Sequence, residues 1–240
     1  MIQPLPLRPD SNYLIDESKM RGTAERIYFP KNEKDICEIV RSADSEKSSL
    51  TISAMRTGVC GGAVPNGGIL LSLEKMNRII GMGYDNGYFV RVEPCVTVRQ
   101  LSEMLLSKHV SGLLNITEDA VKKFRDNPKK YFYPVDPTET EGSLGGNTAT
   151  NASGPRTLKY GPTRNWVCRL KVVLHDGTAI NVPRGRYYAV GRHFDAVIDG
   201  VHLKFDVPSY DYNTSVKNST GLFSKDNMDL IDIFIGSEGL

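Results

Sequence analysis

Apolar and polar positions along the chain follow patterns that predict short strands joined by helices and glycine-rich turns. Between Asn32 and Lys47 the apolar residues recur at helical spacing, at Ile36, Ile39, Val40 and Ala43. This pattern predicts an amphipathic helix. The apolar runs Leu50 to Ile52 and Ile69 to Leu73 each predict a strand. We expect the apolar face of the helix to pack on the first of these strands.

The middle of the chain predicts a strand pair and two helices. A β-prone run, Tyr88 to Val92, follows the turn-forming sequence Asp85-Asn86-Gly87. Thr97 and Gln100 have the spacing of a capping box, so we predict a helix from Thr97 to Lys108. A shorter helix is predicted from Thr117 to Asp126, because acidic residues in its first turn and lysines further on suit the helix dipole.

The second half of the chain predicts antiparallel hairpins. Val167 to Leu174 and Thr178 to Val182 flank Asp176-Gly177, a dipeptide typical of tight hairpin turns. Asp199-Gly200 indicates a second hairpin. Hairpins that follow a helix-containing first half predict an α+β fold with two lobes. We expect the first lobe at about residues 26–100 and the second at about residues 101–240.

The last part of the chain predicts a loop and a final helix. Residues 208–225 are polar and aperiodic, which indicates a long functional or disordered loop. Asp226 is placed to cap a helix that continues through Ile235 and ends at Gly236.

Composition sets broad limits on function. The 240 residues carry a net charge of +2, which gives no field that favours nucleic acid or a membrane surface. No stretch has the length of a membrane span and no secretory signal is present, so we expect a cytoplasmic protein. The cysteines lack metal-binding or disulfide spacing, and we expect buried free thiols at Cys37, Cys60, Cys95 and Cys168. None of the four histidines forms a metal pair or neighbours a nucleophile, so the sequence nominates no catalytic base.

Two glycine-rich stretches contain too few large apolar residues to form a core. The first, Ser53 to Gly68, lies between two predicted strands, where successive backbone N–H groups can form an anion-binding concavity. The second, Glu141 to Gly161, has two adjacent glycines just after Ser143, a residue type that caps helices. Helix starts present free N–H groups to anions. Phosphate is therefore the expected ligand, and the spacing matches neither a Rossmann nor a P-loop motif.

Three motifs carry a family resemblance. They are Arg56-Thr57-Gly58-Val59 with Gly61-Gly62, the block Ser143 to Tyr160, and the segment Met228 to Gly239. In this order they resemble the flavin-binding domain of the vanillyl-alcohol oxidase and p-cresol methylhydroxylase superfamily. More narrowly, the chain is similar to the flavin subunit of glycolate oxidase and to D-lactate and D-2-hydroxyacid dehydrogenases. The resemblance implies a two-lobed, PCMH-type FAD-binding domain over residues 1–240, with a mixed small sheet and helices, and a mainly antiparallel sheet with flanking helices.

The resemblance also implies which residues hold FAD. Backbone N–H groups of the first glycine-rich loop would bind the diphosphate, at Ala54, Met55, Arg56, Thr57, Gly58, Val59, Gly61, Gly62 and Ala63. Arg56 is assigned as a backbone donor only, since its side chain suits a solvated surface equally well. The ribityl chain and flavin ring would be wrapped by Pro134, Asp136, Ser143, Gly145, Gly146, Asn147, Asn151 and Gly154, with Tyr160 nearby. Glu238 would lie near the adenosine side of FAD or at the lobe junction. The plain alternatives are turn or cap roles for Asn147 and Asn151, and a solvated acid at Glu238.

The chemistry implied by the resemblance is oxidation of a small 2-hydroxy acid such as glycolate or D-lactate. In the resembling enzymes a histidine beyond the flavin domain deprotonates the substrate and flavin N5 accepts the hydride. We expect this chain to lack the substrate domain and any catalytic residue, and to be inactive alone. The implied partner is an iron–sulfur or other electron-acceptor subunit. A nonenzymatic FAD-carrying electron-transfer module and a nicotinamide-dependent flavin reductase remain open. FAD is expected to be noncovalent, because the loop has no histidine and Cys60 is interpreted as a small buried filler.

Overall fold

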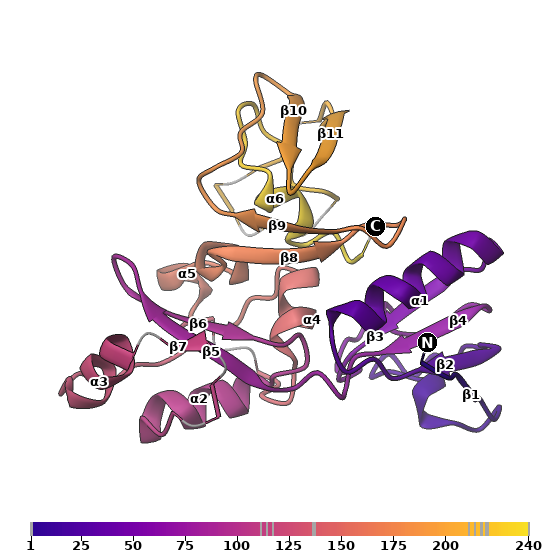
Figure 1. Ribbon diagram of the computed structural model, residues 1–240, viewed down its shortest axis with the longest axis horizontal. Helices are drawn as coiled ribbons and strands as arrows, with labels where there is room; N and C mark the ends of the chain where they lie inside the picture. The colour runs from indigo at the N-terminus through magenta and orange to yellow at the C-terminus, as the bar shows by residue number, and fades with distance from the viewer. Residues whose placement is uncertain are drawn as a thin grey trace.

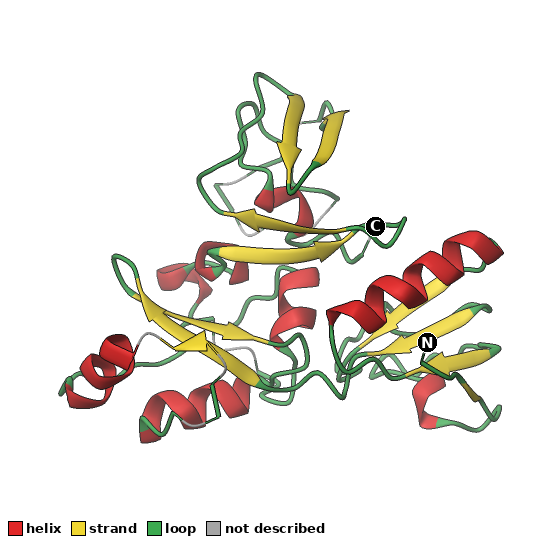
Figure 2. Ribbon diagram, in the orientation of Figure 1, coloured by secondary structure: helices red, strands yellow, loops and turns green. Residues whose placement is uncertain are grey.

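The computed structural model of the chain describes residues 2–110, 112–113, 115–116, 118–135, 138–210, 212–213, 215–216, 218 and 221–239. The elements form three groups around a short central helix, α4 (Leu144–Ala149) (Figure 1). Helices accompany the strands of the first two groups, and hairpins dominate the third (Figure 2). The expected α+β class, with a small mixed sheet first and antiparallel strands later, is confirmed.

The first group is a four-stranded sheet with one long helix. Its elements are β1 (Leu5–Pro6), β2 (Arg26–Tyr28), α1 (Glu33–Glu46), β3 (Leu50–Ser53) and β4 (Ile69–Ser72). Strand β4 lies between β2 and β3 and is parallel to both, and β1 is an antiparallel edge strand. The Asn32 side chain caps α1 by accepting a hydrogen bond from the N–H of Asp35 (3.0 Å). Ile39 and Ala43 pack with Leu50, so the predicted helix and its packing are confirmed.

The second group is a three-stranded sheet backed by two helices. Its elements are β5 (Ile79–Tyr84), β6 (Tyr88–Val92), α2 (Val98–Ser107), β7 (Asn115–Ile116) and α3 (Glu118–Asp126). Strand β5 is central, antiparallel to β6 and parallel to β7. The capping box of α2 is present: the Thr97 N–H donates to Gln100 Oε1 (2.8 Å) and the Gln100 N–H donates to Thr97 Oγ1 (3.1 Å). The strand pair and both helices are confirmed, although the predicted start of α3 at Thr117 lies outside the described residues.

The hydrophobic cores do not change over at about residue 100, where the boundary between the two lobes was expected. Residue 100 lies inside α2, whose Leu101 and Met104 pack with Met82 of β5 and Phe124 of α3 in one core. The sheet of the first group has a separate core, and so does the last part of the chain. The division between the first two groups therefore falls between β4 and β5.

The third group consists of two hairpins and a short helix. Its elements, with those that lead into it, are α5 (Thr157–Tyr160), η2 (Thr163–Trp166), β8 (Arg169–Val173), β9 (Ala179–Pro183), β10 (His193–Ile198), β11 (Val201–Asp206) and α6 (Ile231–Phe234). Both predicted hairpins are present, β8 with β9 and β10 with β11. Asp199 and Gly200 both have positive φ (49° and 85°), as a two-residue hairpin turn of this kind requires. Phe194, Ile198 and Ile231 lie in the core beneath the hairpins.

The predicted C-terminal helix is only partly correct. Helix α6 starts at Ile231, and the Asp226 carboxylate does not cap it but accepts a hydrogen bond from Arg192 Nε (2.7 Å). The N–H of Asn227 donates to Gly191 O (2.7 Å) and the N–H of Leu230 donates to Tyr187 O (2.8 Å). Because this segment pairs with residues 187–191, the helix does not start before Ile231, and tertiary pairing prevails over the local helix signal. In residues 208–225, the described positions form neither helix nor strand, as expected.

Candidate cofactor site

The glycine-rich loop between β3 and β4 presents a run of free backbone donors. The backbone amides of Met55 to Ala63 donate no hydrogen bond to any acceptor in the described part of the chain. The loop begins at the carboxyl end of β3, the side of a parallel sheet where ligands commonly bind. A backbone N–H bonded to a charged group contributes about 1.5–3 kcal/mol. Several such donors in one loop fit a diphosphate.

Two glycines of this loop have different structural roles. A Cβ built on Gly58 has no atom within 4 Å, so the space beside this residue is open to a ligand. Gly61 has φ of +78°, and a Cβ there would collide with the Met20 methyl group. Gly61 is thus required by the fold. Gly58 leaves a surface against which a bulky group can approach the backbone.

The N-terminal segment supports the loop from the other side. The N–H of Glu17 donates to Arg56 O (3.2 Å), and Arg56 has a left-handed backbone (φ 58°). The Arg56 guanidinium lies over the Tyr13 ring (4.8 Å), and the Tyr13 hydroxyl donates to the Glu74 carboxylate (3.0 Å). Burial, followed by the Glu74 contact, raises the pKa of Tyr13. The Arg56 side chain therefore has a fixed place on an aromatic ring.

The start of α4 is not a free anion site, which corrects the expectation from its sequence. Ser143 caps the helix as predicted, accepting from the Gly146 N–H (3.1 Å). The N–H of Leu144 donates to Val96 O (2.8 Å), and that of Gly145 donates to Pro94 O (2.9 Å). The chain itself satisfies these donors, so they are not available to an anion. A Cβ on Gly145 would lie 2.7 Å from Pro94 O, and this contact is why the position is glycine.

Asn147 faces the loop from α4. A Cβ built on Gly142 lies 3.5 Å from both Asn147 Oδ1 and Thr57 Oγ1, which places these two polar groups around the same point. Asn147 is 8% exposed, and its Nδ2 has no partner at hydrogen-bonding distance among the described residues. A buried amide donor in this state is costly without a ligand. Its position suits an acceptor on a bound cofactor.

Asn151 does not share this surface. It follows the end of α4 with φ of 47°, and its Oδ1 accepts from the Arg164 N–H (3.0 Å). The two asparagines therefore do not project side by side from one helix, as their spacing had suggested. Asn151 instead joins the end of α4 to η2.

Tyr133 is a polar neighbour of Asn147 that the sequence did not single out. Burial raises the pKa of the Tyr133 phenol, and the Thr163 and Asn147 side chains oppose that rise. Tyr133 directly precedes Pro134, and this adjacency was the available signal. Pro134 is buried, and Asp136 lies outside the described residues.

The third motif meets the other two at the end of the chain. The N–H of Gly236 donates to Thr148 O (2.9 Å), and that of Glu238 donates to Ala149 O (2.8 Å). Glu238 Oε2 lies 3.8 Å from a Cβ built on Gly62. The loop, α4 and the last turn therefore converge. Tyr160 and Gly154 lie apart, around α5, where the Tyr160 ring packs on Phe132 (5.6 Å) and the Gly154 N–H donates to Thr157 Oγ1 (2.9 Å).

The cysteines differ in part from the expectation. Cys37 and Cys95 are buried, but Cys60 and Cys168 are exposed. Cys60 is thus not a buried filler, because the loop turns its side chain outward. Burial raises the pKa of the Cys95 thiol to about 12. All four histidines are surface or hairpin residues, as expected.

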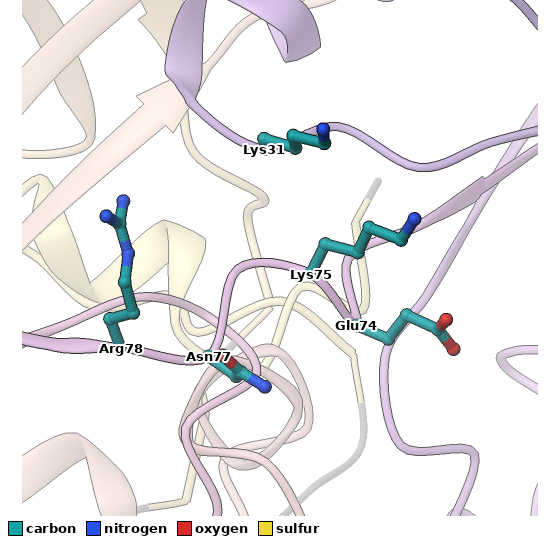
Figure 3. Close-up of a pocket in the computed structure, with 5 residues that line it drawn as sticks. All are labelled: Lys31, Glu74, Lys75, Asn77 and Arg78. Carbon is teal, nitrogen blue, oxygen red and sulfur yellow. The ribbon is translucent and has the colours of Figure 1, made fainter.

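An open hollow lies between Lys31, just before α1, and the segment that joins β4 to β5. Figure 3 shows Lys31, Glu74, Lys75, Asn77 and Arg78 around it. Arg78 is paired with the buried Glu93 (2.7 Å). Glu74 lines this hollow and also accepts the hydrogen bond of Tyr13, the ring on which Arg56 lies. None of its residues was predicted as a site residue.

Comparison with known proteins agrees with this arrangement. The family model described as FAD binding domain matches residues 24–118 and 125–183. D-lactate dehydrogenase of Anaerostipes hadrus is 34% identical over 176 residues, which cover 72% of this chain and 32% of that protein. D-2-hydroxyglutarate dehydrogenase of Stutzerimonas stutzeri (strain A1501) is 31% identical over 215 residues, 89% of this chain and 34% of that protein. The chain thus spans about a third of these relatives.

A solved structure shares the fold. The crystal structure of 6-hydroxy-D-nicotine oxidase from Arthrobacter nicotinovorans matches with a TM-score of 0.56 and 19% identity, over 76% of this chain and 36% of that chain. Within the described part of the present chain, no helix combines the length and apolarity needed to cross a bilayer.

Proposed function

Because the chain belongs to the family of FAD binding domains, we propose that its glycine-rich loop holds the diphosphate of FAD and that α4 faces the flavin. FAD is the cofactor of this family. The observation that carries the assignment is the run of free amides from Met55 to Ala63, next to the unpartnered amide of Asn147. Both are donors, and FAD offers acceptors in its phosphates and in the ring carbonyls and nitrogens.

The residues of the proposed site divide by chemistry. The amides of the loop would bind the phosphates, and the open side of Gly58 admits them. Asn147 and Thr57 would orient the polar part of the flavin that lies between loop and helix. When bound, FAD supplies a hydride acceptor. The role of this chain is to bind the cofactor, to orient it and to keep it at a fixed place in the fold.

We further propose that the whole protein oxidises a small 2-hydroxy acid. The support is that the relatives are D-lactate and D-2-hydroxyglutarate dehydrogenases. Removing a hydride from such a substrate also requires a base, and the described chain places no histidine at the loop or at α4. The base would come from a further part of the protein or from a partner. Two electrons left on the cofactor must then pass to an acceptor, such as an iron–sulfur subunit.

The cofactor assignment is tested by titrating the purified chain with FAD and with FMN and following flavin fluorescence. We expect saturable FAD binding and FMN binding weaker by at least about tenfold, because FMN lacks the diphosphate. Equal affinity for the two flavins would remove the loop from the site. Anaerobic addition of D-lactate, glycolate, D-2-hydroxyglutarate or NADPH to the FAD-loaded full-length protein identifies the donor: bleaching by NADPH alone would contradict the 2-hydroxy acid proposal.

A further inference from the structure

Arg164 is a buried cation at the junction of α4, η2 and the third group. Its side chain is 11% exposed. Nη1 donates to the backbone carbonyl of Asp232 and to its carboxylate (3.1 Å for Oδ1), and Nη2 donates to the carbonyl of Ile235. The guanidinium lies 4.3 Å from the centre of the Phe223 ring. Burial lowers the pKa of Arg164, and Asp232 opposes this by favouring the charged form.

The contacts of Arg164 meet where the last turn of the chain docks on α4. Ile235 is the residue before Gly236, which has φ of +84° and donates its N–H to Thr148 O (2.9 Å). A Cβ on Gly236 would lie 3.0 Å from Asn151 Cβ and 3.5 Å from Arg164 Nη2. The backbone N–H of Arg164 is in turn held by Asn151 Oδ1. The guanidinium therefore fixes the carbonyl just before the turn, and Asn151 fixes the arginine.

We propose that Arg164 is a positioning residue of the cofactor site, which places the Glu238 carboxylate beside Gly62 by holding the turn that starts at Ile235. This inference rests on the proposed FAD site. Lysine cannot replace the arginine, because its single ammonium group lacks the fork that reaches Asp232 and Ile235 together. The position of Glu238 thus depends on a side chain that has no contact with the loop in the described structure.

The chemistry of Glu238 identifies the part of the cofactor that it meets. An ionised carboxylate only accepts hydrogen bonds and is repelled by phosphate. Next to the diphosphate loop, its partner must be a donor, and FAD carries donors on both sides of the diphosphate: the ribityl hydroxyls and flavin N3–H on one side, the ribose hydroxyls and adenine amine on the other. We assign Glu238 to the adenosine side, because the proposed site already gives the flavin side to Asn147 and Thr57. Glu238 is exposed and free to accept from them. Arg164 therefore supports recognition of the adenosine half of FAD. FMN lacks that half, so its affinity should not change when Arg164 is substituted.

A double-mutant cycle on flavin affinity tests this assignment. Dissociation constants for FAD and for FMN are measured for wild type, Arg164→Lys, Glu238→Gln and the double variant, alongside thermal unfolding without flavin. We expect each single change to weaken FAD binding about tenfold. The double variant should bind FAD within about twofold of the weaker-binding single variant, because the two residues act as one unit. FMN affinity should stay within about twofold in every variant.

Arg184→Lys is the matched control. Arg184 also binds Asp232 Oδ1 (3.0 Å) and donates to Arg164 O (3.0 Å), but it does not touch Ile235 in the described structure. It should lower the unfolding temperature and leave FAD affinity unchanged. If Arg164→Lys fails to fold, Gly236→Ala displaces the same turn and should lose affinity in the same way.

The outcomes separate the two proposals. The positioning role is overturned if the two losses of FAD affinity multiply in the double variant. It is also overturned if Arg164→Lys lowers only stability and not FAD affinity. Neither result contradicts the cofactor site. A wild-type chain without FAD binding would instead overturn the proposed site itself. Equal loss of FMN and FAD affinity would show that Glu238 does not read the adenosine half.

Discussion

Gly58→Val is the most selective perturbation of the proposed diphosphate loop. In the free protein a Cβ at this position meets no atom within 4 Å, and the φ of Gly58 is not positive, so the folded chain accommodates the side chain without strain. Surface substitutions of this kind change stability by about 0.5 kcal/mol or less. The branched side chain would, however, fill the space through which phosphate oxygens reach the backbone.

The expected loss of FAD affinity follows from the hydrogen bonds between loop amides and phosphate that the valine side chain would prevent. If two charge-assisted bonds are lost, each contributing about 1.5–3 kcal/mol, binding weakens by about 3–6 kcal/mol. This corresponds to a dissociation constant roughly a hundredfold to ten-thousandfold higher. Fluorescence titration with FAD measures the loss, and thermal unfolding without FAD measures the stability.

Gly87→Val provides the matched control. Gly87 also has open space around its Cβ position and no positive φ, but it lies in the turn between β5 and β6. Its substitution should leave FAD affinity unchanged. A folded Gly58→Val protein that binds FAD within about threefold of wild type would place the phosphates elsewhere and refute the reasoning.

Gly145→Ala should lower the stability of the chain by about 1–3 kcal/mol in urea unfolding, because the added methyl group would lie 2.7 Å from Pro94 O; unchanged stability would mean that the backbone relaxes freely there. At pH 8 a thiol reagent should label Cys60 and Cys168, which are exposed, but not Cys95, whose pKa is raised to about 12 by burial. Saturating FAD should protect Cys60 alone, as mass spectrometry of the labelled peptides can show, and labelling of Cys60 at the same rate with FAD would count against its place in the site. Acid precipitation should leave all flavin in the supernatant; a yellow pellet would mean a covalent bond, for which Cys60 is the exposed candidate in the loop.

The features that could be predicted from the sequence are those that local chemistry decides. The capping box at Thr97 and the turn at Asp199-Gly200 each satisfy backbone groups within a few residues, so their outcome depends little on the rest of the chain. The same holds for α1, whose apolar face and Asn32 cap are visible in the sequence.

The features that could not be predicted depend on partners far along the chain. Asp226 has the sequence of a helix cap, but its segment pairs with residues 187–191. The first amides of α4 look free in the sequence and are taken by carbonyls of Pro94 and Val96. Likewise, nothing near Arg56 indicates that its side chain lies on Tyr13. These contacts are decided by tertiary packing, which spacing within a motif does not encode.

The contact between Glu238 and the loop at Gly62 also has a consequence for how the protein is made. These residues are far apart in the sequence, so their meeting closes a very long loop, and such contacts form late in folding. On a ribosome, the first glycine-rich loop emerges long before the turn that completes its surroundings. A nascent chain can therefore build its first sheet early but gains full affinity for the cofactor only after the turn that carries Glu238 has been synthesised. From then on, FAD stabilises selectively those molecules that have finished folding.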